Sequence, residues 1–279
     1  MKLIAAILVL SLLSSFSSCN KDARMQKKSD NGKEISISKN EAEQELSSVK
    51  SISIRVFDKI PHDKEAYTQG LFYHDGYLYE STGQRGFSSL RKIDPETGEI
   101  IKKADVPGQY FSEGISLHNN KIYMITWTSG KCFVYDPETF EMKKEMNYQG
   151  QGWGLTNYND HLLMSDGSNI LRIIDPGEFT IESNISIVDE NYNPIGYLNE
   201  LEYIDGNVWA NIWMKDKIAV IDPENEKLRY WVDISHLRSG FIRNPDQEVA
   251  NGIAFNKEDN MIYLTGKYWE YIFLVKLPE

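Results

Sequence analysis

Thr68-Gln69-Gly70-Leu71 is the first of five similar phrases that recur along the chain. The others are Ser112-Glu113-Gly114-Ile115, Gly152-Trp153-Gly154-Leu155, Asn199-Glu200-Leu201-Glu202-Tyr203 and Asn251-Gly252-Ile253-Ala254. Measured at Gly70, Gly114, Gly154, Glu200 and Gly252, the intervals are 44, 40, 46 and 52 residues. Repeats of about 40–50 residues that are rich in short strands are typical of propeller blades. Equivalent points of successive blades meet at the propeller axis, so the variable polar residues of these phrases are expected to form one site.

A second repeat runs in phase with the first and ends four of the units on Asp-Pro. These dipeptides are Asp94-Pro95, Asp136-Pro137, Asp175-Pro176 and Asp222-Pro223, spaced 42, 39 and 47 residues apart. Asp-Pro starts turns, because Pro fixes φ at the second turn position and cannot extend a central strand. The runs between the two signals, such as 76–81 and 121–127, are β-branched and aromatic, as strands should be.

The five phrases predict an all-β fold, a five-bladed β-propeller over residues 51–279. The last unit ends near Leu277 without a fourth strand, whereas the segment 51–57 has the alternation of a spare strand. We therefore expect this N-terminal strand to complete the last blade and close the ring, which leaves no unpaired end blade. A sixth blade would have to lie in the 52-residue interval, which is too short for two four-stranded blades.

The first 50 residues have a different composition. A basic start, an apolar stretch over 3–13 and small residues predict a secretory signal peptide over 1–18. Cys19 follows the small residues as the lipidated cysteine of a bacterial lipoprotein does; the alternative is an ordinary cleaved signal with an incidental cysteine. Residues 19–50 are polar and predict a disordered tether. We expect an exported, membrane-anchored lipoprotein, on the periplasmic side or at the cell surface.

Charge, cysteine content and histidine spacing argue against nucleic-acid binding, an intrachain disulfide and a histidine metal site. The formal net charge of −11 argues against nucleic-acid binding, which needs a basic surface. Apart from Cys19 the only cysteine is Cys132, which has no partner for an intrachain disulfide and is expected to be a small buried hydrophobe. The five histidines show no metal-ligand spacing. We expect a monomer that requires no cofactor, although converging strand starts could hold a structural Ca²⁺ on the axis.

The repeated positions supply the candidate site. They bring one carboxylate, Glu113, together with amides, indoles and a cation: Gln69, Asn199, Asn251, Trp127, Trp153, Trp213 and Lys267. A carboxylate among aromatic rings and amides suits a cationic amine, through an ion pair and cation–π contacts. A nearby Lys could stabilise negative charge that develops on a carbonyl. The alternative is that such polar residues only satisfy crowded backbone groups at the strand starts.

The chain resembles the glutaminyl-peptide cyclotransferases (glutaminyl cyclases) of plants and bacteria over residues 60–276. The resemblance rests on phrases in one order: Tyr67-Thr68-Gln69-Gly70-Leu71, Tyr79-Glu80-Ser81-Thr82-Gly83, Ser88-Ser89-Leu90-Arg91, Phe111-Ser112-Glu113-Gly114-Ile115, Gly152-Trp153-Gly154-Leu155, Ser165-Asp166-Gly167-Ser168, Leu198-Asn199-Glu200-Leu201-Glu202-Tyr203, Ala210-Asn211-Ile212-Trp213, Asn251-Gly252-Ile253-Ala254 and Thr265-Gly266-Lys267. It implies a five-bladed propeller that converts N-terminal glutamine of peptides or proteins to pyroglutamate and releases ammonia.

The same resemblance implies roles for single residues. The essential carboxylate falls on Glu113, and the other catalytic polar groups on Lys267 and Asn199. Substrate-binding positions fall on Gln69, Tyr67, Phe111, Trp127, Trp153 and Trp213. The chain departs from the family pattern at Tyr67, Ser112, Gln151 and Glu270, where Phe, Gly, an acidic residue and Pro are usual. The family is unlike the animal-type cyclases, which are zinc enzymes on another fold.

Two other functions stay open on the sequence. A metal-dependent propeller lactonase also gathers Glu and Asn at its axis, but it needs several convergent metal-binding carboxylates and normally six blades. A non-catalytic ligand-binding propeller on a lipoprotein tether would keep the scaffold without needing Glu113.

Overall fold

The structure is a computed structural model that describes residues 25–28, 34–37, 50–239, 244 and 248–276. The chain divides into two compact units, Met1–Ser48 and Val49–Glu279. In the first unit, β1 (Met25–Lys28) and β2 (Glu34–Ile37) pair in antiparallel fashion. The predicted signal peptide, Cys19 and most of the predicted tether lie outside the described residues. The only described helix is a short 3₁₀ segment, η1 (Ser235–Arg238), so no helix in the described part of the chain is long and apolar enough to span a membrane.

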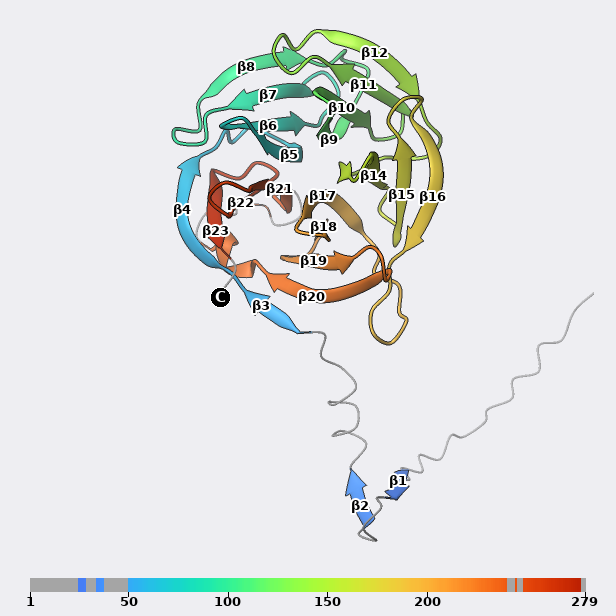
Figure 1. Cartoon of the computed structure of the whole chain (residues 1–279). Helices are drawn as coiled ribbons and strands as arrows, with labels where there is room; N and C mark the ends of the chain where they lie inside the picture. Colours follow the sequence, from blue (N-terminus) through green and yellow to red (C-terminus); the bar gives the residue numbers. More distant parts are fainter. Residues whose placement is uncertain (1–24, 29–33, 38–49, 240–243, 245–247, 277–279) are drawn as a thin grey trace, which may run out of the picture. The chain divides into compact units, whose positions relative to one another are not determined.

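The second unit is the five-bladed propeller that the repeats predict. Its sheets surround a centre, with one inner strand from each blade nearest the axis (Figure 1). The first blade is β5 (Thr68–His74), β6 (Tyr77–Thr82), β7 (Ser89–Ile93) and β8 (Ile100–Asp105). The second is β9 (Ser112–His118), β10 (Lys121–Thr126), β11 (Lys131–Tyr135) and β12 (Met142–Asn147). The third is β13 (Leu155–Tyr158), β14 (His161–Ser165), β15 (Ile170–Asp175) and β16 (Thr180–Ser186).

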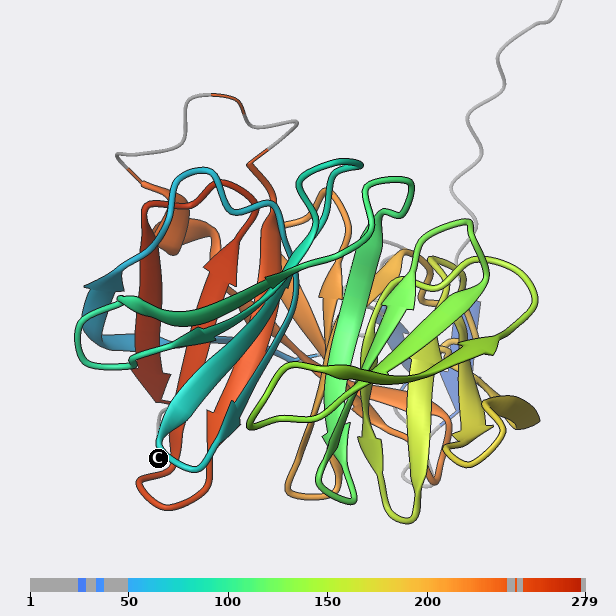
Figure 2. The ribbon, with the colours of Figure 1, turned by 90° about the horizontal axis from the view of Figure 1, so that it is seen from above.

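The last two blades share the N-terminal segment of this unit. The fourth blade is β17 (Leu198–Ile204), β18 (Asn207–Ile212), β19 (Lys217–Asp222) and β20 (Lys227–Asp233), with β3 (Ser51–Ser53) added. The fifth is β21 (Ala250–Asn256), β22 (Met261–Gly266), β23 (Tyr271–Lys276) and β4 (Arg55–Pro61). Seen from the side, the blades run between two rims of loops (Figure 2).

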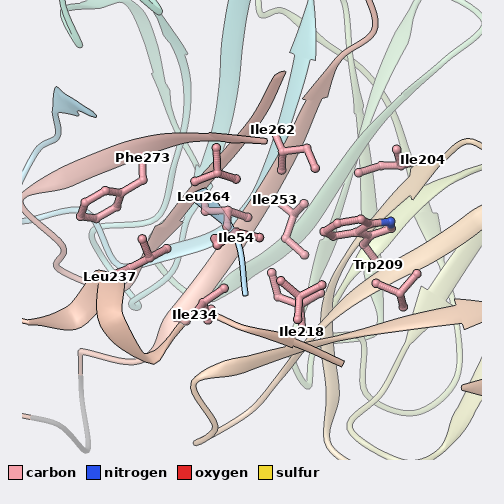
Figure 3. Close-up of a cluster of buried hydrophobic side chains, with 14 of the residues drawn as sticks. Ile54, Ile204, Trp209, Ile218, Ile234, Leu237, Ile253, Ile262, Leu264 and Phe273 are labelled. Carbon is pink, nitrogen blue, oxygen red and sulfur yellow. The ribbon is translucent and has the colours of Figure 1, made fainter. Parts of the chain in front are cut away.

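The sequence predicts that the segment 51–57 joins the last blade as one strand; in the structure only β4 joins the fifth blade, and β3 joins the fourth. The chain breaks at Ile54, and β3 pairs in parallel with β20 of the fourth blade, whereas β4 pairs antiparallel with β23 of the fifth. The physical reason lies in Ile54, whose side chain is only 6% exposed and packs among side chains of both blades, including Trp209 and Leu264 (Figure 3). Burying Ile54 between two sheets requires the chain to cross from one sheet to the other.

The repeated glycines are explained by the crowding of the inner strands. A Cβ atom on Gly114 would lie 2.4 Å from the backbone N of Leu155, and one on Gly154 would lie 2.0 Å from the carbonyl O of Asn199. Each glycine therefore permits the backbone of the next blade to approach the axis. The polar residue beside each glycine is carried to the same central region.

The Asp-Pro dipeptides lie in turns, as predicted, but each turn joins the third and fourth strands of a blade, so the blade does not end there as the repeat suggests. Asp94 Oδ1 accepts hydrogen bonds from the backbone N–H groups of Glu96 and Thr97, at 2.8 and 3.0 Å. Asp136 makes the equivalent pair with Glu138 and Thr139. Between the sheets, buried apolar side chains fill the core, and Cys132 is fully buried there as expected.

Candidate active site

A pocket of about 320 Å³ lies at the centre of the propeller. It is lined by Tyr67, Gln69, Phe111, Glu113, Trp127, Trp153, Asn199, Trp213 and Lys267. These are the nine catalytic and substrate-binding positions that the sequence singles out, and all five blades contribute to them. They come from the starts of inner strands and from the ends of second strands, which lie at the same end of the propeller because neighbouring strands are antiparallel.

Glu113 is the buried carboxylate of this pocket. It is 5% exposed, and its backbone is held by Ser81 Oγ, which donates a hydrogen bond to the Glu113 carbonyl O at 2.5 Å. Burial raises the pKa of the Glu113 carboxyl well above its usual value, and the positive charge of Lys267 opposes this rise only in part. The preceding residue, Ser112, donates from its hydroxyl to the carbonyl O of Thr82 at 2.6 Å. The serine that departs from the family pattern thus ties the start of β9 to the first blade.

Lys267 is also only 5% exposed. Burial lowers the pKa of its ammonium, and Glu113 opposes this change. Lys267 Nζ lies 4.8 Å from the centroid of the Tyr67 ring, within cation–π range. The Tyr67 hydroxyl stays protonated at ordinary pH, because burial and the neighbouring Glu113 raise its pKa to about 12. The extra hydroxyl that Tyr67 brings is therefore a neutral group.

The amides of the site have defined orientations. Asn251 Nδ2 donates hydrogen bonds to the carbonyl O of Thr68 and to Gln69 Oε1, both at 3.0 Å. Asn199 is 2% exposed, and its Oδ1 has no hydrogen-bond partner in the described part of the chain. The sequence places Asn251 among the repeated polar positions, but its contact with Gln69 could not be read from the spacing.

The aromatic walls of the pocket are joined by Gln151. Its Oε1 accepts hydrogen bonds from Trp127 Nε1 at 2.8 Å and from Trp153 Nε1 at 3.1 Å. The ring of Phe111 meets those of Tyr67 and Trp127 edge-on, at 6.0 and 5.7 Å between centroids. Sequence reasoning noted Gln151 only as a departure from an acidic residue and missed that it positions two indoles.

A second group that sequence reasoning missed lies beneath the turn that carries Lys267. His62 Nε2 lies 2.9 Å from Glu80 Oε1, and His62 Nδ1 lies 2.9 Å from the carbonyl O of Trp269. Thr68 Oγ1 donates to the same Glu80 oxygen at 2.6 Å, and Arg91 Nη1 lies 3.5 Å from the other. This buried network links the start of β5 to the turn after β22. Its sequence signals were the motifs that contain Thr68, Glu80 and Arg91, whereas His62 lies in none of them.

Further along β17, the carboxylates of buried Glu200 and half-buried Glu202 hold neighbouring inner strands. Glu200 Oε1 accepts a hydrogen bond from the backbone N of Leu71 at 3.2 Å, and Glu202 Oε1 accepts one from Phe255 N at 3.1 Å. Burial raises the pKa of Glu202 to about 8 and that of Glu200 well above its usual value. Within the residues that the structure describes, no three His, Cys, Asp or Glu side chains gather as a set that could hold a metal ion.

Comparisons of the sequence and of the structure with known proteins point to one family. Residues 32–277 match the family model described as glutamine cyclotransferase. The chain belongs to the glutamine cyclotransferase family. It is 37% identical over 232 residues to the glutaminyl-peptide cyclotransferase of Arabidopsis thaliana, covering 81% of this chain and 72% of that protein. The crystal structure of Myxococcus xanthus glutaminyl cyclase superposes with a TM-score of 0.76 at 31% identity, covering 81% of this chain and 97% of that one. The family thus accounts for the five blades and for the order of the motifs.

Proposed function

We propose that the protein is a glutaminyl-peptide cyclotransferase that converts the N-terminal glutamine of peptides or proteins to pyroglutamate and releases ammonia. The observation that carries this proposal is the placement of one buried carboxylate, Glu113, in a pocket walled by aromatic rings. Such a site accepts a primary amine with a short polar side chain. Membership of the glutamine cyclotransferase family and the similarity to the plant and bacterial enzymes support the same activity.

In the proposed reaction, Glu113 moves one proton. The α-amine nitrogen of the substrate attacks the side-chain carbonyl carbon, and it must be neutral to do so. The Glu113 carboxylate takes a proton from the amine as the new C–N bond forms. It then returns the proton to the side-chain nitrogen, whose bond to carbon breaks as ammonia leaves. Because burial raises the pKa of Glu113, the group is a stronger base than an exposed glutamate, which suits it to both steps.

The aromatic walls of the pocket bring the substrate amine close to the side-chain carbonyl. A free glutamine side chain rotates about several bonds, and only folded conformers bring the amine and the side-chain carbonyl together. A pocket bounded by Phe111, Trp127 and Trp153 favours the folded conformers, which lowers the entropy lost on reaching the transition state. The hydrogen bonds of Gln151 hold two of these rings in place before substrate binds.

The polar groups divide between the two ends of the substrate. Gln69 Oε1 is occupied by Asn251, so its NH₂ group is the part that can donate to the side-chain carbonyl of the substrate. Lys267 supplies a positive charge where negative charge develops on that carbonyl. Asn199 Oδ1, which is buried and has no hydrogen-bond partner among the described residues, can accept a hydrogen bond from the substrate amine.

The direct test is incubation with a Gln-initiated dipeptide amide. Turnover releases ammonia and gives a product lighter by the mass of ammonia. A protein that binds the peptide and leaves it unchanged would be a binding propeller, and the proposal would be rejected.

We further propose that turnover needs no metal, since Glu113 and Lys267 already supply the base and the positive charge. A metal-dependent enzyme such as a lactonase would instead lose all activity with a chelator and regain it with a specific metal. A structural Ca²⁺ on the axis would show as a lower Tm after chelation, with turnover retained below that Tm.

We also propose that the protein is exported, cleaved before Cys19, lipidated there and active as a monomer. The support is the basic and apolar N-terminal segment that ends in Ser17-Ser18-Cys19. Fractionation of cells that express the wild type and Cys19→Ser tests the anchor. The wild type should sediment with membranes and the variant should be released; unchanged membrane association of the variant would contradict lipidation. Size-exclusion chromatography of the 51–279 domain tests the oligomeric state.

A further inference from the structure

A row of aromatic rings leads out of the pocket along one side of its mouth. Trp153 and Trp213 line the pocket, and their ring centroids lie 5.7 Å apart. Trp213 in turn lies 6.0 Å from Tyr197, which does not line the pocket. Exposure rises along the row, from half-buried Trp153 to 39% for Trp213 and 57% for Tyr197. Met214, next to Trp213, is 40% exposed. Tyr197, Trp213 and Met214 together are called the shelf below.

Backbone contacts hold the shelf in place. The carbonyl O of Gly167 accepts a hydrogen bond from Tyr197 N at 2.8 Å, and the carbonyl O of Tyr197 accepts one from Trp213 N at 2.9 Å. A Cβ atom on Gly167 would lie 2.7 Å from the Trp153 ring, so this glycine lets the indole pack directly on the backbone. The ring positions are therefore set by the fold.

Two shelf residues adopt a strained backbone conformation. Tyr197 has φ 63° and Met214 has φ 62°, in the left-handed region where bulky residues are uncommon and Gly or Asn is more readily accommodated. Both large side chains are exposed, Tyr197 in ring contact with the pocket-lining Trp213 and Met214 next to Trp213 in the chain. Strained residues of this kind often occur at ligand-binding sites.

The charged groups beside the shelf are largely paired. Among the described residues, Asp166 pairs with Arg172 and Asp216 pairs with Arg238, each at 2.5 Å, and Lys215, next to Met214 in the chain, is exposed. On the Trp127 side, Arg85 Nη2 donates a hydrogen bond to Thr128 Oγ1 at 3.4 Å, and Phe87, two residues from Arg85, is 79% exposed. The rings of Trp153, Trp213 and Tyr197 are the ones that form a continuous row of ring contacts from the pocket to an exposed side chain.

We propose that the shelf binds the side chain of the second residue of the substrate and favours an apolar or aromatic one there. This inference rests on the proposed function, because it takes the glutamine residue to fill the pocket. The peptide chain of such a substrate must then leave through the mouth. A large apolar side chain at the second position can cover Tyr197 and Met214, and removing that surface from water favours its binding.

The test compares kcat/KM for Gln-Phe-amide, Gln-Gly-amide and Gln-Glu-amide. The wild type should prefer Gln-Phe over Gln-Gly by roughly 3- to 10-fold, the range expected for one aromatic contact. The variants are Tyr197→Asn and Met214→Asn, because Asn tolerates a left-handed backbone and removes the apolar surface. In each variant the Gln-Phe to Gln-Gly ratio should fall toward one.

Tyr192→Asn is the matched control. Tyr192 is also an exposed tyrosine with φ 63°, but its ring lies over Lys227 Nζ at 4.7 Å and does not touch the pocket. This variant should keep the wild-type ratio. Two results would overturn the proposed role of the shelf and leave the proposed function standing. One is equal kcat/KM for the three dipeptides in the wild type, and the other is a Gln-Phe preference that survives in both shelf variants. No turnover of any Gln peptide would overturn the proposed function itself.

Discussion

Asn251 Nδ2 donates a hydrogen bond to Gln69 Oε1 across 3.0 Å, and this contact fixes which end of the Gln69 amide faces the pocket. The orientation of Asn251 is itself set by the carbonyl O of Thr68, which can only accept. The backbone of the first blade therefore determines, through a side chain of the fifth, that Gln69 presents its NH₂ group to a ligand.

Replacing Asn251 tests this orientation. Asn251→Asp removes the donor, so the NH₂ group of Gln69 should turn toward the new carboxylate and its oxygen toward the pocket. We expect kcat on Gln dipeptides to fall at least about 10-fold, since loss of one oxyanion donor typically costs 10²- to 10³-fold. Asn256→Asp is the control, because Asn256 is a buried residue of the same strand that uses its Oδ1 to accept from Glu258 N. An Asn251→Asp enzyme with wild-type kcat would refute the proposed orientation.

Glu113→Gln keeps the size of the side chain and removes the base. If Glu113 moves the proton, kcat should fall by about 10²-fold or more, the lower end of general acid–base catalysis. Circular dichroism and Tm should stay close to the wild type, because the amide has nearly the same size and shape as the carboxyl group. Glu138→Gln, in an exposed turn, controls for the loss of one negative charge. Near-normal kcat in Glu113→Gln would make this residue a structural carboxylate.

Lys267→Met should move the acidic limb of the pH–rate profile. The Lys267 ammonium lowers the pKa of Glu113, so its removal should raise that pKa further above the usual value. Glu113 would then ionise at higher pH, and the acidic limb of kcat/KM should shift upward in pH along with a lower maximal rate. The measurement is kcat/KM for one Gln dipeptide across the pH range. A lower rate with an unmoved acidic limb would contradict the electrostatic coupling.

Gln151→Leu should loosen the aromatic walls. The change removes the oxygen that both indole N–H groups share, with little change in volume. We expect KM to rise several-fold, because the net free energy of two partly exposed hydrogen bonds corresponds to a change of that size. Gln151→Glu keeps an acceptor and should retain more of the wild-type KM. Equal KM in Gln151→Leu and the wild type would show that the indoles need no such support.

His62 and Glu80 should make stability depend on pH. Burial alone would lower the pKa of His62, but the Glu80 carboxylate outweighs it and the pKa lies above 6.5 in the folded protein. The stability from His62 is therefore complete below pH 6.5 and lost as pH rises through the folded pKa. Glu80 is also buried, yet His62 and Arg91 hold its pKa below 4.5, so its contribution is lost as pH falls through that lower value.

His62→Gln tests this pair. The wild type should lose Tm as pH rises above 6.5, whereas the variant should start from a lower Tm and show a flatter curve there. Breaking a buried ion pair typically costs about 3–5 kcal/mol, so the loss should be measurable by thermal unfolding. His236→Gln, in the exposed part of η1, is the control. Parallel wild-type and His62→Gln curves would contradict the assignment.

The repeats were enough to predict the fold class, the number of blades and most of the residues around the pocket, whereas Tyr67 and Phe111 came only from the family resemblance. Spacing can do this because each blade is one unit, and the same register position in every blade faces the axis. The Gly70, Gly114 and Gly154 positions already mark where the inner strands crowd together. The predictions for residues 1–50 stay predictions, since that part of the chain is largely outside the described residues.

Only the tertiary structure decided which polar atoms meet. The Asn251–Gln69 contact joins residues 182 positions apart, and His62 reaches Trp269 across 207 positions. Neither follows from a local pattern, because the first contact needs the first and last blades side by side and the second needs β4 to join the fifth blade. The break at Ile54 has the same origin: alternation in the sequence predicts an extended strand, but burial of this side chain between two finished blades determines where the strand divides.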